Sequence, residues 1–146
     1  DTYFVVAHFH YVLVTGSLFS IYAGAYFWLP KWTGHMYNDS LSKWHFWCSL
    51  ISVNLLFFPM HFLGLAGMPR RIPDYALQFA DFNKWVSIGG FAFGLSQLIF
   101  LAVVIKCIKG GEKAPAKPWD GAEGLEWTVP SPAPYHTFST PPKIED

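Results

Sequence analysis

The sequence predicts an all-α membrane protein with three transmembrane helices and an extended, proline-rich C-terminal tail. Three apolar segments, at about residues 2–29, 44–65 and 85–105, are each long enough to cross a hydrocarbon core of about 30 Å, at about 1.5 Å per helical residue. The 146 residues are 52% hydrophobic and 14% charged, and the apolar ones are concentrated in these segments. We therefore divide the chain into a three-helix transmembrane part, residues 1–109, and a tail, residues 110–146.

The first segment has no acidic or basic residue between Thr2 and Pro30, which is typical of a membrane-spanning helix. It carries two histidines, His8 and His10. Helical residues advance by about 100°, so this spacing places the two rings roughly 200° apart, on opposite faces. They cannot share one metal ion, but each can present a nitrogen to a different flat cofactor such as haem. Hydrogen bonding between helices is the alternative.

The second and third segments show how the spans are expected to pack. Asn54 and Gln97 lie inside them and are expected to bridge helices by hydrogen bonds. Small residues at every fourth position predict where neighbouring helices can approach closely in lipid. These residues are Gly16, Ser20, Gly24, Gly90 and Gly94. We assign no metal or cofactor role to the remaining histidines, which are His35, His45, His61 and His136.

The distribution of basic residues predicts the orientation. Most lysines lie in the first loop and the tail, so the positive-inside rule places both on the cytoplasmic side, or the mitochondrial matrix side. Arg70 and Arg71 lie on the opposite side, after a Gly/Pro pattern that ends the second helix, and so require an anionic partner. Haem propionates and lipid phosphates are the alternatives. Asp1, on the same side, either binds a hard cation such as Mg²⁺ or caps the first helix.

The prolines of the tail, the two cysteines and the net charge exclude several kinds of structure and function. Seven prolines between residues 115 and 142 rule out a continuous helix there. Cys48 and Cys107 are too far apart in sequence to indicate a disulfide framework or a thiolate metal site. The net charge is zero, without the basic patch of a nucleic-acid-binding domain. The chain starts without Met and with helical signals already present, so we expect a fragment of a longer protein.

Three strings of residues resemble a known family: DTYFVVAHFHYVL from Asp1, NLLFFPMHFLGLAGMPRR ending at Arg71, and GLEWTVPSPAPYHTF in the tail. They resemble the C-terminal part of subunit I of cytochrome c oxidase, a haem–copper terminal oxidase. The resemblance implies that the three spans are the last three of twelve helices. It also implies an enzyme that passes electrons from cytochrome c to oxygen and pumps protons outward.

The resemblance also implies roles for individual residues in cofactor binding. His8 would be the axial ligand of the high-spin haem iron and His10 an axial ligand of the low-spin haem iron, with Phe9 between the two haems. Arg70 and Arg71 would hold haem propionates. Tyr3 would lie near the same propionates, and Asp1 would bind a magnesium or manganese ion.

The cofactors and partners implied by the resemblance are two haem A groups, copper, Mg or Mn, cytochrome c, the other subunits of the oxidase and membrane lipid. The copper ligands would lie upstream of this chain, so the fragment alone would not be catalytically complete. The membrane would be a bacterial inner membrane or, alternatively, a mitochondrial inner membrane. Two other functions stay open at this point: a haem–copper quinol oxidase, and a non-catalytic three-helix packing module.

Overall fold

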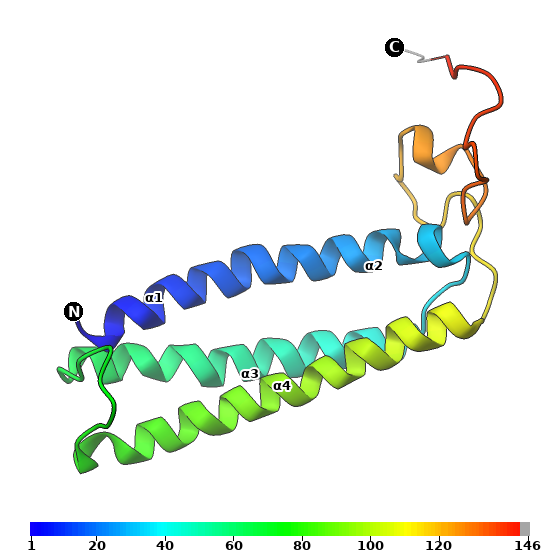
Figure 1. The fold of residues 1–146 in the computed structure, drawn as a ribbon. Helices are drawn as coiled ribbons and strands as arrows, with labels where there is room; N and C mark the ends of the chain where they lie inside the picture. Colours follow the sequence, from blue (N-terminus) through cyan, green and yellow to red (C-terminus); the bar gives the residue numbers. More distant parts are fainter. Residues whose placement is uncertain (144–146) are drawn as a thin grey trace.

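The computed structural model of the chain describes residues 1–143 and is built from long helices that run side by side (Figure 1). The helices are α1 (Tyr3–Leu13), α2 (Phe19–Thr33), α3 (Asp39–Leu65) and α4 (Ala80–Lys109). A π-helical segment, Val14–Leu18, joins α1 to α2, so that these two helices form one continuous span. Three spans are long and apolar enough to cross a membrane, and the described residues contain no strand. The predicted three-helix membrane fold is confirmed.

The first residues of α1 and α3 are fixed by capping side chains. The hydroxyl of Thr2 accepts a hydrogen bond from the backbone N–H of Phe4, so Thr2 caps α1, and of the two alternatives given for Asp1 the capping role is wrong. Asn38 caps α3 by accepting a hydrogen bond from the N–H of Leu41 at 2.8 Å. This cap starts α3 five residues before the apolar segment at Trp44, and these five residues are mostly polar.

The closest helix contacts are made at glycines. A Cβ atom on Gly89 of α4 would lie 2.6 Å from the backbone nitrogen of Leu56 and 2.8 Å from the carbonyl carbon of Leu55, both on α3. A Cβ atom on Gly64 of α3 would collide with the backbone of Phe4 on α1. Only the absence of a side chain at these glycines lets the backbones approach so closely.

The small residues predicted at helix contacts are only partly placed there. Gly90 lies near the Leu56 side chain, but within residues 1–143 a Cβ atom added to Gly16 or to Gly94 would have no neighbouring atom within 4 Å. For the contacts among these three spans, the prediction is therefore wrong at Gly16 and Gly94. A four-residue spacing identifies one face of a helix, but it does not say which neighbour covers that face.

Polar side chains join the spans, as predicted for Asn54 and Gln97. The Tyr11 hydroxyl of α1 donates to Asn54 Oδ1 of α3, and the Tyr22 hydroxyl of α2 donates to Gln97 Oε1 of α4, both at 2.5 Å. These hydrogen bonds satisfy polar groups that lipid could not.

The tail folds back against the end of α2, where Figure 1 shows it beyond the helices. One side chain that holds it is Lys31, which is only 6% exposed. Its ammonium group donates to the carbonyl oxygens of Ala116 at 2.9 Å and Val129 at 2.7 Å. The same Nζ atom lies 5.2 Å from the ring centroid of Trp127. Lys31 is not the only attachment, since the indole N–H of Trp119 donates to the carbonyl of Phe27 on α2 at 2.9 Å and the N–H of Ala114 donates to the carbonyl of Gly34 at 2.9 Å.

We expect Gly89→Ala to destabilise the packing of α4 on α3, because the new methyl group meets backbone atoms that cannot rotate away. Overpacking of this kind typically costs about 1–3 kcal/mol of unfolding free energy. The measurement is the thermal stability of the full-length subunit in detergent. Gly94→Ala is the matched control, since that position is open in the described chain. Equal stability of the two variants would contradict the packing.

We expect Lys31→Met to release the tail, because two carbonyl oxygens lose a charged donor, and such bonds contribute about 1.5–3 kcal/mol each. Limited trypsin digestion after Lys113, next to the buried Ala114, measures the release. Lys43→Met is the control, since Lys43 is exposed and pairs only with Asp39 in the described structure. A cleavage rate unchanged from wild type in Lys31→Met would show that the tail is held by other contacts.

Candidate functional site

The two histidines of the first span lie on an unbroken α-helical stretch, Tyr3–Leu13, so their rings project on opposite sides of α1. Ala7, completely buried, marks the face of α1 that packs in the core with residues of α3. His8 is exposed and His10 is half-buried. The structure keeps the two imidazoles apart, as their spacing predicts.

The ring of His10 is held at one edge and on its faces. Its Nδ1 lies 2.8 Å from the backbone oxygen of Val6, one turn earlier in α1. A carbonyl only accepts, so Nδ1 carries the proton and Nε2 keeps a free lone pair. The ring stacks on Phe57 of α3, with centroids 5.2 Å apart and planes 4° apart, and lies 4.1 Å from the Phe9 ring. Histidines that bind metals are commonly oriented in this way by a hydrogen bond at the other ring nitrogen.

His8 has a different environment. Its side chain is exposed. Phe9, which lies between the two histidines in the sequence, is 38% exposed. Both imidazoles lie at the surface of one helix, and a neutral imidazole there could bind the central metal of a flat cofactor.

The predicted residues at the other end of α1 are brought together although they are distant in sequence. The N–H of Tyr3 donates to the carbonyl of Met68 at 2.9 Å, and the N–H of Arg70 donates to the carbonyl of Asp1 at 3.0 Å. These bonds place the start of α1 beside the segment that follows α3 (Figure 1). Asp1, Tyr3, Arg70 and Arg71 therefore lie at one end of the bundle.

Asp1 and Arg70 also contact each other directly. The Nη2 and Nε atoms of Arg70 lie 2.7 Å and 2.9 Å from Asp1 Oδ1. Arg71 is exposed and has a φ of 60°, a left-handed conformation that is uncommon outside glycine. Among residues 1–143 no group of three or more His, Cys, Asp or Glu side chains could hold a metal ion. Asp1 therefore requires further ligands from outside this set to complete a metal site.

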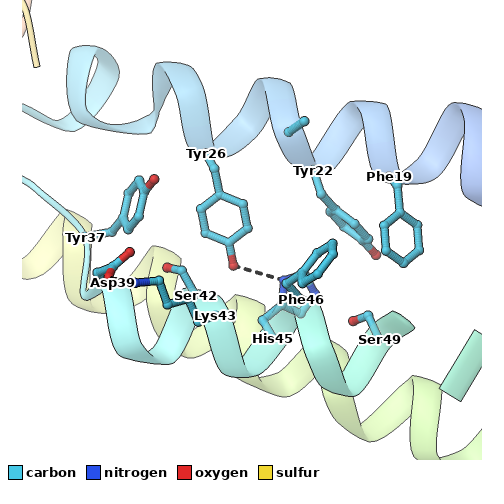
Figure 2. A pocket seen from close by; sticks show the side chains of 11 residues that line it. Phe19, Tyr22, Tyr26, Tyr37, Asp39, Ser42, Lys43, His45, Phe46 and Ser49 are labelled. Atoms are coloured by element: carbon cyan, nitrogen blue, oxygen red, sulfur yellow. Dashed lines mark hydrogen bonds and ion pairs between the residues drawn. The ribbon is translucent and has the colours of Figure 1, made fainter. Parts of the chain in front are cut away.

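A cavity of about 370 Å³ lies between α2 and α3, and sequence reasoning gave it no role (Figure 2). Its wall includes His45, which is only 1% exposed and whose Nδ1 lies 3.0 Å from the Tyr26 hydroxyl oxygen. His45 Nε2 lies 3.4 Å from Gln97 Oε1 on α4. Two features of the sequence could have predicted this cluster: His45 lies inside an apolar span, and Tyr22 and Tyr26 are spaced by one helical turn on another span.

At the cavity's edge, Tyr37 connects α2 to α3 and packs edge-on against the Tyr26 ring, with centroids 5.1 Å apart. Burial raises the pKa of the Tyr37 hydroxyl above its ordinary value of 10.0, and the neighbouring Asp39 and Cys107 raise it further. Tyr37 therefore stays neutral at physiological pH. The cavity wall also includes the ion pair of Asp39 and Lys43, and His45 connects it to Gln97 of α4.

Comparison with known proteins adds independent information. The profile of the family described as Cytochrome C and Quinol oxidase polypeptide I matches residues 1–92. The chain is similar to cytochrome c oxidase subunit 1 of Cereibacter sphaeroides, with 47% identity over 100% of this chain and 26% of the relative. For the subunit 1 of Yarrowia lipolytica the identity is 44%, over 97% of this chain and 30% of the relative. For that of Synechocystis it is 45%, over 99% and 26%. The chain thus spans about a quarter of the length of the curated relatives it matches.

Proposed function

Since this chain belongs to the cytochrome c and quinol oxidase polypeptide I family, we propose that it is part of the catalytic subunit of a cytochrome c oxidase. The whole enzyme would reduce oxygen to water with electrons from cytochrome c and pump protons outward. The level of identity over nearly the whole chain supports this proposal. The observation in the structure that supports it best is the pair of imidazoles on opposite sides of one apolar helix, each free to bind a separate iron.

In this proposal His10 is an axial ligand of the low-spin haem iron and His8 the axial ligand of the high-spin haem iron. When bound, the two haems and copper would supply the electron transfer and the oxygen chemistry. The hydrogen bond from His10 Nδ1 to Val6 presents Nε2 as the binding atom. Phe9 lies between the two ligands in the sequence and would bridge the electron route between the haems.

The cluster at the end of α1 would bind the acidic groups of the cofactors. Arg70 uses two nitrogens on Asp1, and its remaining N–H groups, together with those of Arg71, can pair with haem propionates. Tyr3 would lie near the same propionates. Asp1 would contribute one ligand to a magnesium or manganese ion, the others coming from elsewhere in the subunit. The haems would be haem A, and the copper ligands would lie outside this chain.

The orientation and the partners follow from the same proposal. Residues 1–109 would form the membrane part, and residues 110–146 a tail on the cytoplasmic or matrix side. The tail attachment at Lys31 and the basic end of α4 lie at the opposite end of the bundle from Asp1 and Arg70, as the positive-inside rule requires (Figure 1). The membrane would be a bacterial inner membrane, or alternatively a mitochondrial one. Lipid and the other oxidase subunits would cover the exposed apolar side chains.

A quinol oxidase is the second candidate function, since the family description covers both electron donors. The relatives described above are all named cytochrome c oxidase, which favours cytochrome c. Oxygen consumption with reduced cytochrome c, compared with that with a quinol, distinguishes the two donors in the whole enzyme.

We expect His8→Ala in the full-length subunit to abolish the high-spin haem spectrum and His10→Ala to abolish the low-spin one, because each iron loses an axial nitrogen. Reduced-minus-oxidised difference spectra of the purified oxidase measure both. His61→Asn is the control: His61 also lies between α1 and α3, where it packs on Phe4, but it is assigned no iron. If both alanine variants retained both haem spectra, the assignment would be wrong.

A further inference from the structure

Phe57 of α3 lies parallel to the ring of His10, which is the best-aligned aromatic contact of either predicted haem ligand. The centroids are 5.2 Å apart and the planes differ by 4°, the offset-stacked arrangement that aromatic pairs prefer. Phe9, the other neighbour, is tilted by 32°. Phe57 is therefore the neighbour whose plane matches that of His10.

Phe57 is itself held in place by the core between α1 and α3. It packs against the buried cluster that includes Ala7, Met60 and Leu63. The close approach of Gly64 to the backbone of Phe4 prevents α3 from sliding along α1 near this cluster. The Phe57 ring therefore gives His10 a fixed surface on a rigid helix.

Two contacts are needed to define the orientation of an imidazole ring. The hydrogen bond from Nδ1 to the Val6 oxygen fixes the position of one edge of the imidazole ring. This single contact does not by itself fix the tilt of the ring plane. A parallel aromatic ring fixes the plane, because turning the imidazole would push its edge into the neighbour's face. Together the two contacts define the direction of Nε2.

We propose that Phe57 is a positioning residue that sets the plane of the His10 imidazole as it binds the low-spin haem iron. This inference rests on the proposed role of His10. Phe57 acts through His10 rather than on the reacting atoms. Its effect should therefore be seen in the electronic signature of the low-spin haem, which depends on how the axial imidazole planes are oriented.

The test is Phe57→Leu in the full-length oxidase, with electron paramagnetic resonance of the oxidised low-spin haem as the readout. We expect the largest g value to move by more than the linewidth while the low-spin haem content stays at one per enzyme. Phe57→Tyr keeps the ring and should retain the wild-type spectrum. Phe58→Leu is the matched control, because Phe58 is the adjacent residue on α3, is 52% exposed, and packs on Tyr11 and His61 but not on His10.

An unchanged g value in Phe57→Leu, or an equal shift in Phe58→Leu, overturns the proposal. If Phe57→Leu does not assemble, Phe57→Met is compared in the same way and must show the shift. His10→Ala separates this inference from the proposed function. If that variant loses the low-spin haem while Phe57→Leu leaves the spectrum unchanged, only the positioning role fails. If it keeps the low-spin haem, the ligand assignment itself fails.

Discussion

The close packing of α1 on α3 is the constraint on which the candidate site depends. Gly64 lets the backbone of Phe4 approach α3 at a distance that no side chain would permit. Beyond this contact, the Tyr3 N–H bonds to Met68, and the chain continues to Arg70, whose N–H bonds to Asp1. The glycine contact, together with these bonds and the hydrogen bond from Tyr11 to Asn54, fixes the register of the two spans. That register places Arg70 at Asp1 and, two turns away, Phe57 at His10.

Several polar side chains inside the spans find hydrogen-bond partners within this chain. Tyr11 and Asn54 satisfy each other, Ser49 and Ser96 lie 2.9 Å apart, and His45 lies between Tyr26 and Gln97. An uncompensated polar group in hydrocarbon is expensive, so such pairs are expected in a membrane protein. His8 is exposed on the surface of α1 and is therefore accessible to a partner outside the described residues, such as the proposed haem.

The number of spans could be predicted from hydropathy, and the separation of His8 from His10 from helix geometry, because both depend on local sequence alone. Contacts between distant residues could not. Gly89 of α4 contacts α3 and Gly94 does not, because α3 covers only one face of α4. The burial of Lys31 could not be predicted either, since its partners are backbone oxygens 85 and 98 residues later in the chain. The plane of His10 likewise depends on a ring from another helix.

The pairing of Asp1 with Arg70 bears on the two roles proposed for this end of the bundle. Both nitrogens of Arg70 approach the same oxygen, Oδ1, of the Asp1 carboxylate. A carboxylate has two oxygens and about four acceptor positions, so Oδ2 remains available to a hard cation. A cation on Oδ2 would offset part of the negative charge of the Asp1 carboxylate. The guanidinium of Arg70 would then pair more strongly with a propionate. The metal-binding and propionate-binding roles are therefore compatible, and one side chain links them.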